Sequence, residues 1–281
     1  MAKVGLLLLG FFVLVIGVGY LFSYLLDSSE ILYFAIIFSV LMSFISYWFS
    51  DKIVLKMVKA QEIKEEVNPE IYRLVRNLCL KANLPLPKIY LIKEQQPNAL
   101  ATGRNENHAV VALTQGLLDK LNQKEIEGVI GHELSHVKNK DMLLQTMVVV
   151  LVGFISILSR WFLWGQMFGG RRNREGGNIL ALAGIVAAIL APIAALLIQL
   201  AVSRSREFLA DASAAHLTLN PEGLAQALEK IAADKNPMKT SQESFAHLYI
   251  ASPFRGESLA KLFMTHPPIK DRVKALREMS F

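Results

Sequence analysis

The chain has 281 residues, of which 53% are hydrophobic, and a formal net charge of +6 at pH 7. Its mean hydropathy of +0.36 is above that of a soluble domain, and its isoelectric point is near 9.3. The positive charge indicates a basic face against anionic lipid, and not a nucleic-acid partner, because no basic and aromatic nucleic-acid module is visible.

Two long segments near the start of the chain, residues 4–26 and 31–50, contain no charged side chain. Either one is long enough to cross about 30 Å of hydrocarbon as a helix. A secretory signal peptide is the alternative for the first segment. This alternative is disfavoured because the apolar core is too long, no small-residue cleavage site follows, and a second apolar segment comes at once.

The charges that flank these two segments predict their orientation. Lys3 precedes the first segment, the connection at 27–30 is acidic, and four lysines follow the second segment between residues 51 and 64. The cytoplasmic ends of membrane helices carry the excess of Lys and Arg. We therefore expect the N-terminus and everything after residue 51 to face the cytoplasm.

The next stretch is typical of a helix followed by short strands. Asn68 as the N-cap and Pro69 at the first helical position predict a helix that runs to about Ala82. Apolar runs typical of strands follow at residues 88–93, 99–102 and 110–113. One edge of such a small sheet can pair with an extended peptide substrate.

A further predicted helix contains the motif His132-Glu133-Leu134-Ser135-His136. Asn122 and Glu125 have the spacing of a capping box at its start. On a helix, His132 and His136 project from one face, where two imidazoles can hold one Zn²⁺. Glu133 is then placed to act on water as a general base, which is the zincin pattern H-E-x-x-H. A solvated helix face without a metal is the alternative.

Two further apolar segments follow, at residues 142–159 and 178–203. The first continues into aromatic residues that suit a membrane interface, and the second contains Pro192, which a membrane helix tolerates with a kink. Two buried core helices are the alternative, because Arg160 interrupts the first segment. If both segments cross, the arginines of the loop at 171–174 lie on the outer side, against the positive-inside rule. Either the first two spans dominate the orientation, or the second pair is a hairpin that does not fully cross.

A catalytic zinc site needs a third protein ligand and one open position beside the two histidines. Glu207 and Asp211 lie four residues apart after the fourth apolar segment and face the same way on a helix. Glu207 can bind the metal, and Asp211 can accept the free ring N–H of a ligating histidine. The alternative is a solvated turn in which these acids pair with Arg204 or Arg206.

The positions of these ligands in the chain constrain its topology. His132 and His136 precede residues 142–203, and Glu207 follows them. The three side chains can meet only if both ends of this segment lie on the same side of the membrane, which an antiparallel helical hairpin provides. The metal would then lie close to the membrane surface.

The remaining cysteine and histidine residues carry weaker expectations. Cys79 is the only cysteine, so no disulfide framework exists, and we expect a small core residue. A Cys–His nucleophile is the alternative. His108, His216 and His247 match no ligand spacing and are expected to be structural or surface residues.

Together these elements predict a mainly α integral membrane protein. It has a zincin-like metalloprotease domain with a small β-sheet and about four transmembrane or membrane-associated helices. The predicted parts are two N-terminal transmembrane helices at 1–50, the first part of a cytoplasmic zinc protease domain at 51–141, a helical hairpin in or at the membrane at 142–203, and the second part of the protease domain at 204–281.

The two motifs, in this order around two apolar segments, resemble those of the HtpX membrane zinc metalloproteases and, more distantly, those of the CAAX prenyl endoproteases. With the two leading apolar segments and residues 97–103, the resemblance covers nearly the whole chain. It implies one zinc ion per chain on His132, His136 and Glu207, with Glu133 as the catalytic base.

The resemblance also implies roles for three residues outside the metal motifs. Asn98 and His266, which precedes a Pro-Pro pair, are expected to line the cleft and to bind the substrate backbone or the tetrahedral oxyanion. Arg272, six residues beyond His266, is expected to orient them.

The function implied is that of a membrane-bound zinc metalloendopeptidase, a hydrolase that cleaves peptide bonds with metal-activated water. Its role would be quality control of misfolded or damaged membrane proteins, as part of a stress response. The implied partners are the lipid bilayer and protein or peptide substrates, and the location is the bacterial inner membrane, multi-pass, with the active site on the cytoplasmic side. The alternative is a zinc-stabilised membrane scaffold without proteolytic activity. A channel or transporter is disfavoured, because no ionisable residue lies in the middle of the first, second or fourth span.

Overall fold

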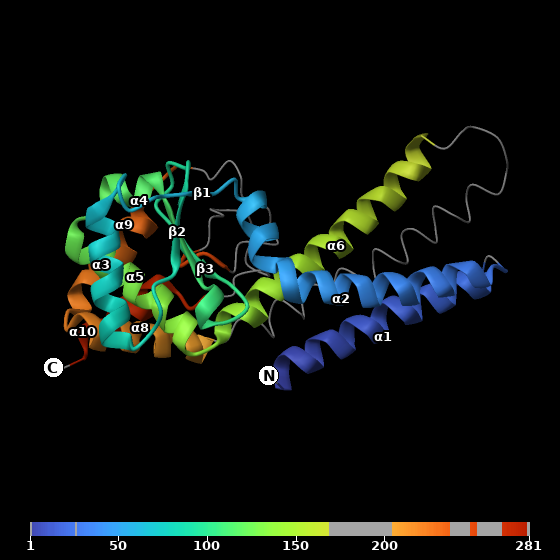
Figure 1. The fold of residues 1–281 in the computed structure, drawn as a ribbon, viewed down its shortest axis with the longest axis horizontal. Helices are drawn as coiled ribbons and strands as arrows, with labels where there is room; N and C mark the ends of the chain where they lie inside the picture. Colours follow the sequence, from blue (N-terminus) through green and yellow to red (C-terminus); the bar gives the residue numbers. More distant parts are fainter. Residues whose placement is uncertain (1, 26, 169–203, 237–247, 252–265, 280–281) are drawn as a thin grey trace. The chain divides into compact units, whose positions relative to one another are not determined.

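The computed structural model describes residues 2–25, 27–168, 204–236, 248–251 and 266–279 (Figure 1). The chain divides into two compact units. Unit 1 comprises Met1–Trp48 and Met147–Ile198, and unit 2 comprises Phe49–Thr146 and Gln199–Phe281. The four-part domain organisation expected from the sequence stays a prediction.

Unit 1 contains the two helices expected near the N-terminus, α1 (Ala2–Leu25) and the first part of α2 (Ser29–Met57). By length and composition, Val4–Tyr24 and Ser29–Met57 can each cross a membrane. The two helices touch where a glycine allows it, because a Cβ at Gly19 would lie 2.3 Å from the Cβ of Ala35. The prediction of two apolar N-terminal helices is confirmed, and α2 continues past the charged residues at which the sequence suggested an end.

The third expected membrane segment corresponds to α6 (Asp141–Phe168), a helix of 28 residues. Its side chains are buried from Asp141 to Val152. Asp141–Phe154 is an apolar helix that is shorter than the two candidate membrane spans near the N-terminus. The fourth expected segment, 178–203, and the arginine loop at 171–174 lie outside the described residues. The number of membrane-crossing helices therefore stays a prediction.

Unit 2 contains a small sheet and several shorter helices. Its strands are β1 (Gln61–Glu62), β2 (Lys88–Ile92), β3 (Ala99–Thr102) and β4 (Val110–Thr114). Its helices are α3 (Pro69–Ala82), the short 3-10 helix η1 (Glu106–His108), α4 (Gln115–Lys120), α5 (Gln123–Lys138), α8 (Arg204–Thr218), α9 (Pro221–Ala233) and α10 (Ile269–Arg277). The three predicted strands and the helix at 69–82 are confirmed. The sequence does not predict β1 and α4, because elements this short give no periodic pattern of apolar residues.

The sheet has the order β1-β2-β4-β3. β2 and β4 are parallel, whereas β1 and β3 pair with their neighbours in the antiparallel direction. β3 is therefore an edge strand among the described residues. All four of its residues are buried.

Three helices of unit 2 begin at asparagine N-caps, and two of these, Asn68 and Asn122, are predicted above. The side chain of Asn68 accepts from the N–H of Ile71, and that of Asn220 accepts from the N–H of Gly223. Asn122 and Glu125 form the complete capping box of α5. Each cap satisfies backbone donors that a helix leaves unpaired at its first turn, so local sequence defines where these helices begin.

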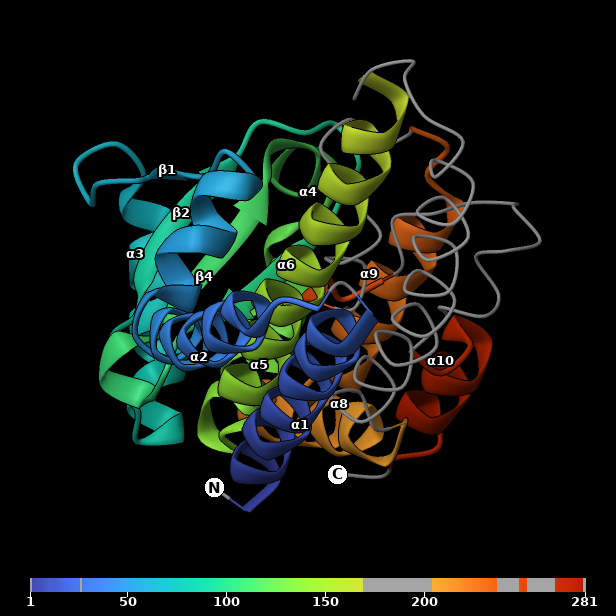
Figure 2. The same ribbon diagram turned by 90° about the vertical axis from the view of Figure 1, so that its right-hand side faces the viewer.

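Helix α5 occupies the centre of unit 2. Figure 2 shows it between the strands with α3 and the helices α8, α9 and α10. A Cβ at Gly128 would lie 2.8 Å from the backbone nitrogen of Leu224, so this glycine permits α5 and α9 to approach closely. From His132 to Val137 every residue of α5 is buried, and the motif residues are thereby removed from bulk water.

Candidate metal centre

Helices α5 and α8 carry three side chains that converge in the interior of unit 2. Within the described part of the chain, His132, His136 and Glu207 form the one group of potential metal ligands, with their ligand atoms all within 4.8 Å of one another. The two Nε2 atoms are 3.2 Å apart. Glu207 lies 3.8 Å from Nε2 of His132 and 3.5 Å from Nε2 of His136. All three residues are at most 5% exposed, so the alternatives of a solvated helix face and a solvated turn are wrong.

The chemistry of this cluster fits a divalent cation. Two ring nitrogens face each other, and the carboxylate atom Oε1 of Glu207 is buried with no hydrogen-bond partner among the described residues. The surrounding network holds four carboxylates and two guanidinium groups, a net charge of −2 when all are ionised: Glu133, Asp141, Glu207, Asp211, Arg206 and Arg272. Buried charge of this kind is costly unless it is neutralised, and one divalent ion would balance it.

The carboxylate of Asp211 contacts Nδ1 of His132, the ring nitrogen that does not face the other candidate ligands, as the sequence predicts. Oδ1 of Asp211 lies 2.9 Å from Nδ1 of His132. Arg272 donates to both oxygens of Asp211, from Nε at 2.8 Å and from Nη2 at 2.7 Å. In spite of burial, the adjacent guanidinium lowers the pKa of Asp211 to about 2. Burial lowers the pKa of His132 to about 4, so the ring is neutral near pH 7 and Nε2 keeps its lone pair for a metal.

A second carboxylate lies behind His136, and sequence reasoning missed it. Oδ2 of Asp141 is 3.6 Å from Nδ1 of His136, and Arg206 donates to the other oxygen of Asp141 at 2.7 Å. Burial lowers the pKa of His136, but the carboxylates of Asp141, Glu207 and Glu133 outweigh it, and the pKa ends above its usual value. Each candidate histidine ligand therefore has its own carboxylate, and each carboxylate has its own arginine.

Glu133 is 2% exposed and lies in the same network. Burial raises the pKa of its carboxyl group to about 7, even though His136, Arg272 and the N–H of Ala101 lower it. A pKa near the working pH is suited to a group that must first accept and then release a proton.

The raised pKa of Glu133 predicts a pH-dependent stability for the metal-free protein. Between the ordinary value of 4.5 and about 7, the folded state binds a proton that the unfolded state has lost, so stability falls as the pH rises through this window. Glu133→Gln removes this loss. At 1.36 kcal/mol per pKa unit, the variant is expected to be more stable than the wild type by up to about 3 kcal/mol at pH 8 and similar near pH 4.5. Thermal unfolding in detergent after metal removal, at both pH values, measures the difference.

The three residues expected to line the cleft have different surroundings. Nδ1 of His266 lies 2.9 Å from Oε2 of Glu207, and its Nε2 is buried without a hydrogen-bond partner in the described structure. The side chain of Asn98 donates to the carbonyl of Ala251 at 2.9 Å. Besides Asp211, Arg272 donates to the carbonyl of Ile250 at 2.8 Å. His266 and Arg272 are thus both next to the ligand cluster, and Asn98 and Arg272 both hold the segment 248–251.

That segment lies against β3. The N–H of Ile250 donates to the carbonyl of Ala99 at 3.1 Å, and the N–H of Ala101 faces the carboxylate of Glu133. The β3 edge of the sheet is therefore next to Glu133, and the carbonyl of Ala99 on this edge already accepts a hydrogen bond from the chain itself.

Other candidate residues lie outside the cluster. Cys79 is buried in the core, and burial raises the pKa of its thiol to about 11, which does not favour a thiolate nucleophile. His108 is exposed and lies next to Asn105 and Arg104. His247 lies outside the described residues.

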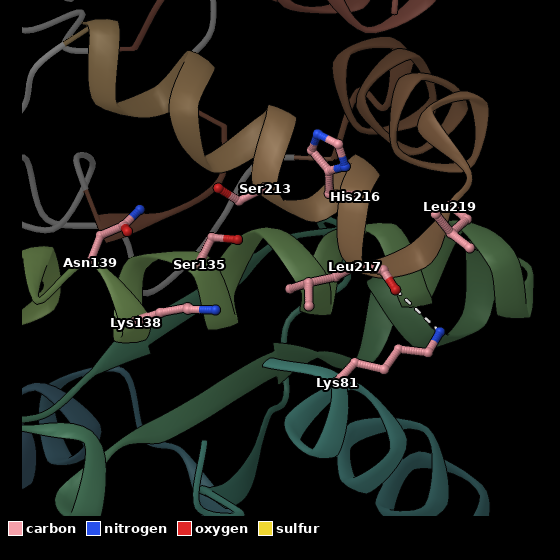
Figure 3. Close-up of a pocket in the computed structure, with 8 residues that line it drawn as sticks. All are labelled: Lys81, Ser135, Lys138, Asn139, Ser213, His216, Leu217 and Leu219. Atoms are coloured by element: carbon pink, nitrogen blue, oxygen red, sulfur yellow. Dashed lines mark hydrogen bonds between the residues drawn. The ribbon is translucent and has the colours of Figure 1, made fainter. Parts of the chain in front are cut away.

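A pocket of about 420 Å³ lies on another side of α5 (Figure 3). Lys81 reaches across it to the main-chain carbonyl of Leu217, at 3.1 Å. The lining residues are Lys81, Ser135, Lys138, Asn139, Ser213, His216, Leu217 and Leu219. None of the candidate metal ligands is among them, so this pocket is separate from the metal centre.

A buried H-E-x-x-H helix, with a carboxylate from a later helix beside its two histidines, is typical of metallopeptidases. The model of peptidase family M48 matches residues 65–280. A protein named Protease HtpX homolog from Syntrophobacter fumaroxidans is 53% identical over 87% of this chain and 88% of its own length. One of the same name from Thermococcus sibiricus is 48% identical over 92% of this chain and 90% of its own length.

The chain therefore belongs to peptidase family M48, among the HtpX homologues, and the resemblance stated from its motifs is confirmed. Among solved structures, the crystal structure of S. mikatae Ste24p aligns with a TM-score of 0.52 and 18% identity. The alignment covers 92% of this chain and 62% of that chain, and it indicates a shared fold.

Proposed function

We propose that this membrane metalloprotease is a zinc-dependent endopeptidase. The observation that supports the proposal is the buried convergence of His132, His136 and Glu207, with Glu133 on the same helix as the two histidines. Two nitrogen ligands and one carboxylate, with a position left open, are the donor set of catalytic zinc sites. The scaffold alternative does not need Glu133 and gains nothing from its raised pKa.

The chemistry divides between the ion and the protein. When bound, a zinc ion supplies Lewis acidity that acidifies water and polarises a carbonyl. Glu133 accepts the proton of the attacking water and passes it to the leaving amine, while the N–H of Ala101 holds its carboxylate in place. Asp211, held by Arg272, keeps the proton of His132 on Nδ1 and so presents Nε2 to the metal.

The substrate is proposed to be an extended peptide that pairs with the β3 edge. His266, placed by Glu207 at 2.9 Å, would hydrogen-bond the developing oxyanion through Nε2. This requires the doubly protonated imidazolium, because Nδ1 donates to the Glu207 carboxylate and the neutral ring has only one N–H. Asn98 is proposed to contribute by holding segment 248–251 beside the strand, and Arg272 by holding both this segment and Asp211. Direct binding of substrate by Asn98 requires that its bond to Ala251 be exchanged.

The proposed setting is a bacterial inner membrane that the chain crosses several times, with the active site on the cytoplasmic side. Two apolar helices near the N-terminus support this setting. The proposed role is the quality control of misfolded or damaged membrane proteins during stress. Protein substrates and the lipid bilayer are its proposed partners.

Metal removal tests this function on the full-length protein in detergent. We expect about one zinc ion per chain. A chelator is expected to abolish both self-cleavage and cleavage of an unfolded protein, and added Zn²⁺ is expected to restore them. Glu207→Gln, which weakens one ligand, should lower metal content and activity together. Cleavage that persists after the metal has been removed would contradict the proposal.

A further inference from the structure

We infer that Asp141 is the positioning residue for His136, and that Arg206 acts through Asp141. This inference rests on the proposed function, since it assigns a role toward the same metal. Asp141 touches neither substrate nor the reacting atoms. It is the first residue of α6 and Arg206 is the third residue of α8, so both belong to unit 2.

His136 and Asp141 each have one buried polar atom that makes no hydrogen bond within the described residues. Nδ1 of His136 and Oδ2 of Asp141 are both buried without a hydrogen-bond partner among the described residues, and they lie 3.6 Å from each other. A small rotation of the imidazole brings them to hydrogen-bond distance. Two buried polar atoms without partners are costly, so the geometry points to a bond that forms when the ring is fixed by a metal on Nε2.

The backbone between α5 and α6 places Asp141 for this contact. Lys140 has a left-handed conformation, with φ of 60°, which is uncommon for a residue other than glycine. In one continuous helix, residues five apart do not share a face, and Asp141 would point away from His136. The left-handed turn at Lys140 ends α5 and returns Asp141 to the ring. A residue in this conformation commonly ends a helix, as Asn83 and Leu219 do after α3 and α8.

The opposite side of Asp141 is held by α8. Nη1 of Arg206 lies 2.7 Å from Oδ1 of Asp141, and the next residue along the chain is the candidate ligand Glu207. Asp141 and Arg206 lie in unit 2 on either side of Met147–Ile198, the stretch of chain that belongs to unit 1. The ion pair therefore joins the two ends of the intervening segment immediately behind the metal ligands.

This arrangement repeats the arrangement behind the other ligand. His132 has Asp211, which Arg272 holds with two hydrogen bonds. His136 has Asp141, to which Nη1 of Arg206 donates. A carboxylate on the ring N–H fixes the tautomer and orientation of a ligating histidine and makes its other nitrogen more basic. Without Asp141, His136 is expected to lose that support while His132 keeps its own.

The decisive variant is Asp141→Asn, because asparagine is nearly the same size as aspartate and lacks its negative charge. Zinc affinity is measured on the full-length protein in detergent by competition with a chelator, and the Co²⁺-loaded protein gives an absorption spectrum of the ligand geometry. We expect zinc affinity to fall about 10–100-fold and the Co²⁺ bands to shift. Arg206→Met should act in the same direction and add little in the Asp141→Asn background, because coupled residues are not additive.

Glu125→Gln is the matched control. It also converts a buried carboxylate to an amide, at the other end of α5, and breaks an ion pair with Lys230 of 2.8 Å. It does not contact the metal ligands, so its zinc affinity and Co²⁺ spectrum should equal those of the wild type. An equal loss of affinity in Glu125→Gln would show that general destabilisation is the cause and would overturn the inference.

The wild type in the same series separates the two proposals. If it binds zinc and shows chelator-sensitive cleavage while Asp141→Asn has unchanged affinity and an unchanged spectrum, the inference about Asp141 fails and the proposed function stands. If the wild type itself binds no zinc, both fail.

Discussion

Glu133→Gln is expected to abolish proteolysis while leaving zinc content intact. The amide has nearly the same size as the carboxyl group but cannot accept the proton of the attacking water or pass it to the leaving amine. Loss of general acid–base catalysis costs about 10²–10⁴-fold in rate. Glu133 is absent from the group of potential ligands, which consists of His132, His136 and Glu207, so metal binding should not depend on it. Cleavage of an unfolded protein and metal analysis of the same preparation measure both effects.

Glu127→Gln is the control for this experiment. Glu127 lies on α5, as Glu133 does, but it is partly exposed and is not one of the buried acids around the ligands. Its amide variant should cleave at the wild-type rate. If Glu133→Gln also cleaves at that rate, the zinc-stabilised scaffold becomes the better interpretation, since a scaffold needs the ligands and not the base.

Local signals in the sequence predict most of the elements that carry the site. Asn68, Asn122 and Asn220 each begin a helix, because a side-chain cap needs only the next three residues to act. The i, i+4 spacing likewise identifies His132 with His136, and Glu207 with Asp211. The structure adds that these two pairs lie together in the interior of unit 2, a contact over 71 residues of chain between His136 and Glu207.

What the sequence does not predict are contacts that depend on a break in a regular pattern. The run through Asp141 continues the helical pattern, and only the left-handed Lys140 brings Asp141 back to His136. Arg206 is a near neighbour of Glu207 and Asp211 in sequence, yet its carboxylate partner at 2.7 Å is Asp141. Segment 248–251 comes from a stretch without periodicity, so its bonds to Ala99 and Arg272 have no local signal.

Arg272→Met is expected to destabilise the protein more than any surface change. The guanidinium is fully buried, with 0% exposure, and it makes two hydrogen bonds to Asp211 and one to Ile250. Methionine fills much of the same volume but leaves the Asp211 carboxylate buried without its arginine. Removing one partner of a buried ion pair costs about 3–5 kcal/mol. The midpoint of thermal unfolding of the full-length protein in detergent measures the loss.

Arg277→Met supplies the comparison on the same helix. Arg277 pairs with Glu222 and Glu229 at 2.9 Å each, but all three side chains are about half exposed, so solvent screens the pairs and the loss should be much smaller. Arg272→Lys should fall between the two variants, because an ammonium keeps the charge and cannot reproduce the two parallel hydrogen bonds. If Arg272→Met lowered the midpoint of thermal unfolding no more than Arg277→Met does, the buried Asp211 carboxylate would not need Arg272 for its stability. The support behind His132 would then have to come from the histidine and its metal alone.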